Sequence, residues 1–344
     1  MKAHTLLFDG KSGVRIESEN LPKLKPNQLR IKTICSAISA GTEMLVYRGQ
    51  IPSNLPLDAE ISVLKKQSGY PMKYGYSLVG EVMQAGNKAD QNFIGKKVFC
   101  FHPHQDHLLM EASQVIPLPK GIKPEQAVFL PAMETALNLV MDAKPSIGER
   151  GIVLGQGVIG LLTTALLANY PLGKLVTLET LPKRQNFSKM MGAEVVLDLN
   201  KKTQFTRLKK LLSPSDLANE PQGADLLFEL SGQQDGLDKL IALAGYHSRI
   251  VIGSWYGTKT SRVHLGGDFH RNRIPIISSQ VSTIEPGLRG RWTKKRRIEL
   301  VWQMIRKIKP ERLISHRFQF SDTAEAYKIL DTNPEECLQL IFTY

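Results

Sequence analysis

The chain has 344 residues, which is long enough for two domains that each bury a core of their own. Its composition, 42% hydrophobic and 22% charged, excludes a disordered chain. The net charge of +13 raises the question of nucleic-acid binding. Much of the excess lies in GLRGRWTKKRRIEL, residues 287–300, which has one aromatic residue and no nucleic-acid-binding motif. We interpret this stretch as a solvated helix start or the rim of an anionic-substrate site.

Cysteine usage and hydropathy bear on the compartment. No apolar run reaches the roughly 20 residues needed to cross a bilayer. Residues 1–17 alternate like a strand and lack the apolar core of a signal peptide. Cys35, Cys100 and Cys337 lie far apart and form neither a disulfide framework nor a CxxC zinc motif. We therefore expect a cytoplasmic protein that does not bind membranes.

Residues 1–121 are predicted to form a β-rich domain, because short strand-like stretches are separated by Gly, Pro and Asn. Helical spacing is rare in this part of the chain. The turn residues of PLPKGI end the region. The predicted strands lie within residues 29–39, 76–86, 96–101 and 108–113.

From residue 122 onward the sequence pattern changes. A helical stretch at 124–143 is followed by strands that alternate with helices. Such alternation predicts a parallel, doubly wound sheet. The predicted strands are 151–155, 175–180, 195–199, 225–230, 249–255 and 275–282, and the predicted helices are 158–170, 184–193 and 234–244. The last part has a helix at 296–308, a strand at 317–321, a helix at 322–330 and a strand at 338–342.

The hexapeptide GQGVIG, which begins at Gly155, fits G-x-G-x-x-G between a predicted strand and a predicted helix. This is the context that a dinucleotide-binding turn requires. Gly155 would allow the tight turn, Gly157 the close approach of backbone to pyrophosphate, and Gly160 the close packing of helix on strand. The helix N-terminus, with Val158 and Ile159, would face the phosphates.

Glu179 ends the next predicted strand, where a carboxylate can accept hydrogen bonds from both ribose hydroxyls and repel a 2′-phosphate. This favours NAD as the cofactor. Lys183 and Arg184 lie just beyond and would instead accommodate the phosphate of NADP. Ligands bind beyond the carboxyl ends of such strands, although ordinary turns look similar. Four further residues there are expected beside the nicotinamide: Ser231, Gly232, Gly253 and Ser254.

Several motifs together resemble the medium-chain dehydrogenase/reductase superfamily, and the resemblance covers the whole chain. SAISAGTE together with METALN is most similar to a branch that includes bacteriochlorophyllide dehydrogenase-like proteins. The motifs are AGTE (40–43), YGYSLVGEV (74–82), PLPKGI (117–122), METALN (133–138) and the glycine turn.

The resemblance implies an α/β fold, with a GroES-like β-rich catalytic domain and a Rossmann doubly wound parallel-sheet domain. The catalytic domain would span residues 1–121 and the Rossmann domain residues 122–288. Residues 289–344 would return and pack on the catalytic domain. The resemblance also implies a homodimer, because residues 275–282 lie where dimers of this superfamily commonly join their sheets.

Zinc-dependent alcohol dehydrogenases of this superfamily hold a catalytic zinc with three side chains. The resemblance places Ala40, Tyr76 and Pro131 at those positions, with Ser77 in place of the neighbouring glutamate. None of these groups binds zinc well. The four-cysteine structural zinc lobe is also missing from residues 95–118. We therefore expect no zinc.

The heptapeptide FHPHQDH, residues 101–107, is the other place where a metal could bind. On a strand, His102 and His104 would face one side and Asp106 would continue the row. Two histidines and a carboxylate can bind a metal, so a zinc-type enzyme with a rebuilt site remains an alternative. Three ligands on one extended segment rarely surround an ion, so we favour polar residues that line a cleft, or a solvated loop.

Without a metal, hydrogen-bond donors must stabilise the charge that develops on the substrate oxygen. The resemblance places Tyr76 where the lost ligand faced the substrate and Thr42 where zinc enzymes keep a proton-relay hydroxyl. Alternatively, Tyr76 only fills the space of the missing zinc ligand, and the Thr42 hydroxyl only forms a hydrogen bond to backbone. His102 or His104 would pass the proton to solvent.

Two neighbouring residues follow from the METALN motif. Glu134 stands in a strongly apolar stretch and is a proton acceptor, a helix cap or a partner of Arg271 or Arg273. Thr135 matches the position that abuts the nicotinamide in the superfamily, so it is expected to contact the cofactor.

Two stretches are expected to recognise substrate. Residues 44–73 form a long connection that carries Tyr47, Arg48, Lys65 and Lys66. Residues 266–280 bring basic side chains close to the expected cofactor, and arginines suit planar or anionic substrates. Contacts between domains or subunits explain these residues equally well. The substrate candidates are Arg48, His270 and Arg273.

The sequence therefore predicts a zinc-independent NAD(P)-dependent oxidoreductase. Its substrate would be a carbonyl, an alcohol or an activated alkene of a polar or ring-bearing small molecule. The alternatives are a zinc-type alcohol dehydrogenase with a metal site rebuilt at His102 and His104, and a non-catalytic dinucleotide-sensing or nucleic-acid-binding relative.

Overall fold

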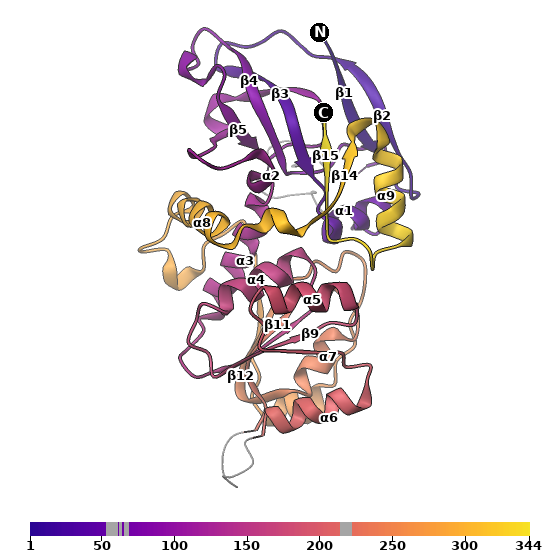
Figure 1. Cartoon of the computed structure of the whole chain (residues 1–344), viewed down its shortest axis with the longest axis vertical. Coiled ribbons are helices and arrows are strands. Elements are labelled where there is room, and N and C mark those ends of the chain that lie inside the picture. Colours follow the sequence, from indigo (N-terminus) through magenta and orange to yellow (C-terminus); the bar gives the residue numbers. More distant parts are fainter. Residues whose placement is uncertain (53–60, 62–63, 65–68, 214–221) are drawn as a thin grey trace. The chain divides into compact units, whose positions relative to one another are not determined.

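The chain forms two compact units (Figure 1). The computed structural model describes residues 1–344 apart from 53–60, 62–63, 65–68 and 214–221. Two residues of the predicted substrate loop, Lys65 and Lys66, lie outside the described residues. Unit 1 comprises Met1–Pro131 and Trp302–Tyr344, and unit 2 comprises Ala132–Val301.

Unit 1 is built on a seven-stranded sheet with the order β14-β15-β3-β4-β5-β7, in which β6 also pairs with β3. β15 lies near the end of the chain and runs antiparallel to β3. Strands from the first and the last part of the chain therefore share one sheet. The strands are β3 (Gln28–Ala37), β4 (Leu78–Ala85), β5 (Lys97–Cys100), β6 (His107–Glu111), β7 (Ile116–Pro117), β14 (Ile314–Gln319) and β15 (Gln339–Thr343).

A separate antiparallel pair and three helices complete unit 1. Helix α1 carries the AGTE motif, and its buried residues Met44, Leu45 and Val46 join a cluster that includes Tyr327 of α9. The pair is β1 (Lys2–Phe8) with β2 (Val14–Asn20), and the helices are α1 (Ala40–Tyr47), α2 (Pro124–Ala127) and α9 (Thr323–Thr332).

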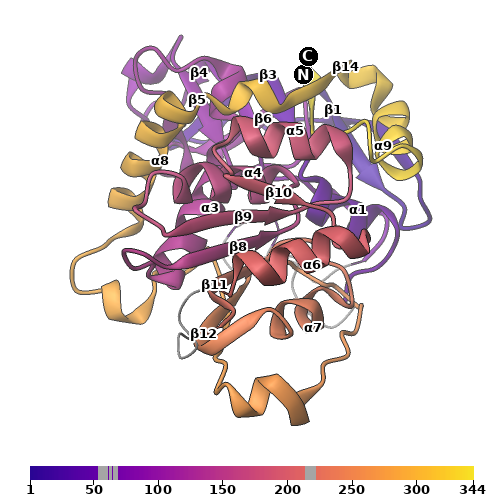
Figure 2. The ribbon, with the colours of Figure 1, turned by 60° about the horizontal axis from the view of Figure 1, so that its bottom comes forward.

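Unit 2 contains a six-stranded sheet with the order β10-β9-β8-β11-β12-β13, and every neighbouring pair in it is parallel. Helices α4 and α5 lie on one face of this sheet, and α6 and α7 on the other (Figure 2). This doubly wound arrangement and the sheet of unit 1 confirm the predicted fold class. The strands are β8 (Arg150–Leu154), β9 (Lys174–Leu178), β10 (Val195–Leu197), β11 (Ala224–Glu229), β12 (Ala244–Ile252) and β13 (Ile276–Ser278).

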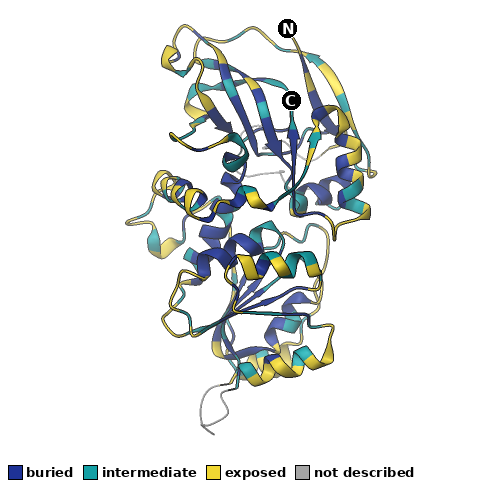
Figure 3. Ribbon diagram, viewed as in Figure 1, coloured by how far each residue is buried: buried dark blue, intermediate teal, exposed yellow. Residues whose placement is uncertain are grey.

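The strands of unit 2 are apolar almost throughout, because helices cover both faces of the parallel sheet. Ile152, Val176, Leu227 and Ile250 come from four neighbouring strands, and none has any exposed surface. Figure 3 shows these central strands as buried and the outer face of α6 as exposed. The helices are α3 (Leu130–Ala143), α4 (Val158–Leu167), α5 (Pro182–Met190), α6 (Lys202–Leu211), α7 (Gly236–Ile241) and α8 (Lys294–Ile308).

Four helices differ from the prediction. Residues 124–143 form α2 and α3 rather than one helix, because Pro131 has no N–H to continue α2 but fits the first turn of α3. Helix α1 was not predicted, because Gly41 is a poor helix former and the apolar residues after it read as a strand. The basic helix α6 was not predicted either.

Two observations concern boundaries and membranes. The chain passes from unit 1 to unit 2 within α3 and returns within α8. The first boundary between the two units therefore lies after the turn residues at 117–122, which end the β-rich region in the sequence. Among the described residues, no helix is both long enough and apolar enough to span a membrane.

Candidate active site

The glycine turn joins β8 to α4 in unit 2. Gly155 has φ of +90°, a conformation that side-chain-bearing residues rarely adopt. A Cβ atom on Gly160 would lie 1.9 Å from the carbonyl oxygen of Gly155, so only glycine allows the helix to approach the strand this closely. Gly157 is the N-cap of α4.

The N-terminus of α4 has room for an anionic group. A Cβ atom added to Gly157 would meet no atom within 4 Å. The first N–H groups of a helix have no intrahelical acceptors, and here they belong to Val158, Ile159 and Gly160. An open helix N-terminus attracts phosphate through these donors and the helix dipole. The residues present therefore fit the pyrophosphate of a dinucleotide.

Glu179 braces the turn from the neighbouring strand. Its Oε2 accepts a hydrogen bond from the N–H of Gln156 at 2.8 Å. Its Oε1 accepts from the N–H groups of Thr180 at 2.8 Å and Leu181 at 3.0 Å. Only 9% of this side chain is exposed, so it is a buried carboxylate held by backbone donors. Arg184 lies half-buried in α5.

Two further turns lie at the same edge of the sheet, because β11 pairs with β8 and with β12. The N–H of Gly232 donates to Ser254 Oγ at 2.9 Å, and the N–H of Gly253 donates to the carbonyl of Glu229 at 3.1 Å. Glu229 Oε1 also accepts from the N–H of Ser231 at 2.9 Å. The structure thus ties together the two turns that the sequence predicts beside the nicotinamide.

Sequence reasoning missed the buried carboxylate of Glu229, which has no exposed surface. The signal was a single acidic residue at the end of an apolar strand, in DLLFEL. Its role in this structure is to hold the loop between β11 and α7.

Glu134 of α3 forms a buried ion pair. Its Oε1 accepts from Arg297 Nε at 3.0 Å and Nη2 at 2.8 Å. An ion pair was one of the alternatives for Glu134, but the partner is Arg297 rather than Arg271 or Arg273. Burial raises the pKa of Glu134, and the Arg297 guanidinium opposes this shift. Thr135 is half-buried on the same helix.

A cluster of three hydroxyl groups lies in unit 1. The Tyr76 hydroxyl donates to Ser39 Oγ at 2.5 Å and lies 3.3 Å from Thr42 Oγ1. Ser39 is the N-cap of α1, and Thr42 lies in its first turn. Tyr76 is half-buried. The sequence predicts Tyr76 and Thr42 as donors and misses Ser39, whose position just before AGTE was the available signal.

The residues of FHPHQDH do not form one row. His102 is buried, and its Nδ1 lies 2.9 Å from the carbonyl of Pro103. His104 is fully buried beside Glu43, and Asp106 bonds to His4 Nδ1 at 2.8 Å. In the described parts of the chain, no group of three or more His, Cys, Asp or Glu side chains could hold a metal ion.

Burial also affects the protonation of His102 in the heptapeptide. It lowers the pKa of His102 to about 4, so this ring is neutral at neutral pH. His104 has no exposed surface, so it does not reach solvent in this structure. The predicted proton transfer from these rings to solvent would therefore need an intermediate carrier.

Known proteins of similar sequence are dehydrogenases. No protein-family model matches the chain. The chain is 22% identical to D-guloside 3-dehydrogenase of Escherichia coli K12 over 337 residues, which cover 92% of this chain and 93% of that protein. It is 23% identical to 2-desacetyl-2-hydroxyethyl bacteriochlorophyllide A dehydrogenase of Rhodobacter capsulatus over 364 residues, which cover 100% and 99%.

Solved structures share the fold along the whole chain. An alcohol dehydrogenase of Escherichia coli CFT073 complexed with NADH has a TM-score of 0.78 at 18% identity, covering 100% of this chain and 99% of that chain. A putative zinc-binding dehydrogenase of Sinorhizobium meliloti bound to NADP has a TM-score of 0.77 at 17% identity, covering 100% of both chains. Along its whole length the chain is therefore similar to dehydrogenases of the medium-chain dehydrogenase/reductase superfamily.

The resemblance places Ala40, Tyr76 and Pro131 at the zinc-ligand positions, with Ser77 next to Tyr76. Ser77 Oγ donates to the carbonyl of Val128 at 2.6 Å. Ala40 begins α1, and Pro131 lies in the first turn of α3. Tyr76 is committed to the hydroxyl cluster. These four residues do not fit a zinc ion.

The predicted substrate residues lie on the surface of their units. Arg48 follows α1, and its Nε donates to Asp331 Oδ1 at 2.7 Å. His270 and Arg273 are exposed in the segment that precedes β13. Arg48 is therefore engaged within unit 1, whereas the other two side chains face solvent in unit 2.

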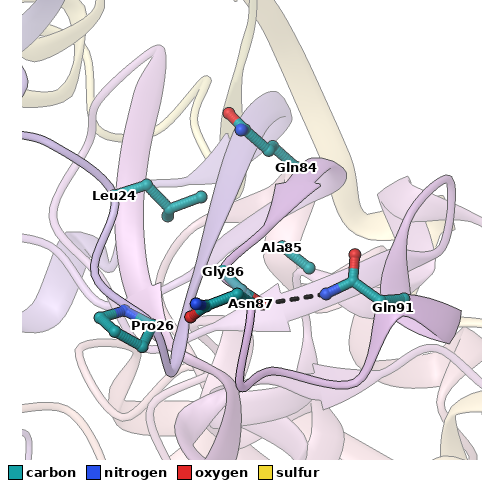
Figure 4. Close-up of a pocket in the computed structure, with 7 residues that line it drawn as sticks. All are labelled: Leu24, Pro26, Gln84, Ala85, Gly86, Asn87 and Gln91. Carbon is teal, nitrogen blue, oxygen red and sulfur yellow. Dashed lines mark hydrogen bonds between the residues drawn. The ribbon is translucent and has the colours of Figure 1, made fainter.

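A surface groove of unit 1 is separate from all of these residues. Figure 4 shows Gln91 Nε2 donating to the carbonyl of Gly86, at 2.9 Å, on one side of this groove. None of the residues that line it is ionisable or matches a predicted site residue, so it offers no group for catalysis. They are Leu24, Pro26, Gln84, Ala85, Gly86, Asn87 and Gln91.

Proposed function

We propose that the protein is an NAD(P)-dependent dehydrogenase or reductase that works without zinc. It exchanges hydride with a carbonyl, an alcohol or an activated alkene of a polar or ring-bearing small molecule. The observation that carries the proposal is the open N-terminus of α4 at Gly157, where a phosphate can approach the backbone. The dehydrogenases to which the chain is similar support the reaction class.

The proposed cofactor is NAD, and NADP is possible. Glu179 favours NAD, because a buried carboxylate at the end of β9 would repel a 2′-phosphate. Arg184 would favour NADP. The remaining proposed cofactor contacts are Thr135, Ser231, Gly232, Gly253 and Ser254.

The hydroxyl cluster supports the proposed acid–base chemistry. When a dinucleotide is bound, it supplies or accepts the hydride. In the structure the Tyr76 hydroxyl donates to Ser39 Oγ. With substrate bound, this proton would turn to the substrate oxygen, and Ser39 or Thr42 would donate to the phenol oxygen instead. In this proposal a hydrogen-bond donor at the substrate oxygen takes the part that zinc would play as a Lewis acid.

The substrate is proposed to be polar or ring-bearing. The similar proteins are named for a sugar glycoside and a bacteriochlorophyll precursor, both of which carry rings. Arg48, His270 and Arg273 are the proposed substrate contacts. Of these, His270 and Arg273 are exposed and available to an anionic or planar group.

The protein is proposed to act as a cytoplasmic homodimer. β13 is an edge strand of the unit 2 sheet, and Ile276 on it is 37% exposed. An unpaired edge with an apolar side chain can pair with a second copy. The mass in solution, measured by light scattering, tests this part of the proposal.

Titration of the purified protein with NADH and NADPH tests the cofactor. We expect saturable binding, and at least a 10-fold weaker affinity in Gly157→Ala, because the added methyl group occupies space that the pyrophosphate needs. The melting temperature should not change, since the methyl group meets no protein atom. Gly290→Ala, at another open glycine, is the matched control. Absence of binding to both nucleotides, or unchanged affinity in Gly157→Ala, would overturn the proposal.

A further inference from the structure

Unit 1 contains a buried carboxylate that none of the chemistry above uses. Glu43 lies on α1, one residue after Thr42, and has no exposed surface. A buried charge is costly unless several donors surround it. Three donors do so, and they come from three separate parts of the chain.

One carboxylate oxygen of Glu43 is bound to the N-cap of its own helix. Oε1 accepts from the N–H of Ser39 at 2.7 Å, and the N–H of Glu43 donates to the carbonyl of Ser39 at 2.7 Å. These reciprocal bonds hold the backbone of Ser39, whose side chain is then free to accept from Tyr76. The orientation of the Ser39 hydroxyl thus depends on Glu43.

The other oxygen is fixed by two residues from distant segments. Oε2 accepts from the hydroxyl of Tyr327 on α9 at 2.5 Å and lies 3.1 Å from His104 Nε2. His104 Nδ1 lies 2.7 Å from Ser36 Oγ, which is 2.8 Å from the Tyr344 hydroxyl. Burial and the Glu43 carboxylate raise the pKa of Tyr327 well above its usual range, so this phenol stays a donor.

The His104 ring links the Glu43 carboxylate to a hydroxyl group, with Nε2 on the side of Glu43 Oε2 and Nδ1 on the side of Ser36 Oγ. Ser36, His104 and Glu43 therefore resemble the serine–histidine–acid arrangement of hydrolases. However, Ser36 has no exposed surface and cannot be reached as a nucleophile. The arrangement serves orientation rather than bond cleavage.

His104 also packs against the segment that leads to Tyr76. A Cβ atom on Gly75 would lie 2.8 Å from Cδ2 of the His104 ring, so this ring packs directly on the backbone one residue before Tyr76. Gly75 has φ of +115°, which a larger residue rarely adopts. Glu43 and His104 therefore hold both partners of the Tyr76–Ser39 hydrogen bond.

We infer that Glu43, clamped by Tyr327 and His104, is a positioning residue that orients the Ser39 hydroxyl and thereby the phenol of Tyr76 toward the substrate oxygen. This inference rests on the proposed function of Tyr76. Glu43 itself touches neither substrate nor cofactor.

A spectroscopic experiment tests the inference without turnover. The protein has nine tyrosines, and 13Cζ labelling gives one NMR signal for each, with Tyr76→Phe assigning the signal of Tyr76. We expect Glu43→Gln and Tyr327→Phe to shift the Tyr76 signal. Lys328→Gln, an exposed change next to Tyr327, is the control and should leave that signal in place. An unmoved Tyr76 signal in both variants overturns the inference, even if the protein reduces no substrate.

Turnover supplies the second test, with NADH or NAD⁺ and three probes: methyl β-D-guloside, (R,R)-2,3-butanediol and D-xylulose. Glu43→Gln should lower kcat about 10- to 100-fold with an unchanged Kd for NADH, because misorientation of a donor costs rate rather than cofactor binding. Tyr327→Phe should lower kcat less, and should have no further effect in the Tyr76→Phe background. An equal loss in both backgrounds would show a merely structural role and overturn the inference. Failure of the wild type with all probes counts against the proposed function alone.

Discussion

Arg297 has the largest side chain among those with almost no exposed surface. It binds Glu134 Oε1 with two nitrogens, Asn138 Oδ1 at 2.5 Å, and the carbonyls of Val281 and Thr283. These bonds tie α3 to the segment between β13 and α8, all within unit 2. A buried pair of this kind costs little when complete, but leaves an uncompensated charge when one partner is removed.

Removal of Arg297 alone should therefore destabilise the protein strongly. We expect Arg297→Met to lower the free energy of unfolding by about 3–5 kcal/mol, as measured by urea denaturation. The double variant Arg297→Met with Glu134→Leu should recover most of this loss, because no buried charge then lacks a partner. A loss below about 1 kcal/mol in the single variant would contradict a structural role for the pair.

His102 predicts a pH dependence of stability. Its pKa is about 4 in the folded chain against an ordinary value of 6.5, so the unfolded chain binds more protons between these values. The free energy of unfolding therefore falls as the pH drops through this window. We expect a contribution of about 2 kcal/mol lost between pH 7 and pH 5. Urea denaturation at both values measures it.

The matched variants for this prediction are His102→Gln and His270→Gln. The first should lose less stability between pH 7 and pH 5 than the wild type, because the buried titrating ring is gone. The second replaces an exposed ring and should follow the wild type. Equal pH dependence in all three proteins would contradict the burial argument.

At the scale of elements, the connection between β8 and α4 depends on two glycines with different structural roles. Gly157 borders open space, whereas Gly160 lies against the backbone of Gly155. In this hexapeptide, the side chain at residue 157 is therefore limited by the space that a ligand needs, and the side chain at residue 160 by the packing of α4 on β8. Alanine substitution at each position distinguishes these two constraints.

We expect Gly160→Ala to lose both stability and nucleotide binding, because its methyl group would force α4 away from β8. Overpacking of this kind costs about 1–3 kcal/mol, which thermal denaturation detects. Gly157→Ala should lose binding only. If Gly160→Ala melted like the wild type, the close approach of helix and strand would not be a constraint.

Elements also show where local pattern fails. Helix α1 was missed although it carries Thr42 and Glu43 and begins directly after Ser39. Its apolar run, Met44 to Tyr47, is buried on all sides and has no helical periodicity. By contrast, β8, α4 and β9 follow their predicted positions closely, because a glycine turn separates each period from the next.

At the scale of the whole molecule, the chain shares the fold of these dehydrogenases, while Ala40, Tyr76 and Pro131 stand where the resemblance places the zinc ligands. We expect elemental analysis of the purified protein to find far less than one zinc per chain. Incubation with EDTA should leave nucleotide-dependent turnover unchanged, because the proposed reaction relies on the hydroxyl cluster rather than on a metal ion. One bound zinc whose removal abolishes turnover would contradict this expectation and favour the zinc-type alternative.

The sequence by itself determined the fold class and the glycine turn. These depend on local features: alternating strand and helix periods, and glycines at fixed spacing. A short window of sequence contains all the information that such features need. The same holds for the mismatch at the zinc positions, which the resemblance showed residue by residue.

Only the tertiary structure decided which polar groups meet. His104 and Glu43 are 61 residues apart, Arg297 and Glu134 are 163 apart, and Tyr327 and Glu43 are 284 apart. Partners at such separations are chosen by how sheets and helices pack, which no local period encodes. This is why the heptapeptide at 101–107, which suggests one metal site, is divided between a buried network and surface bonds.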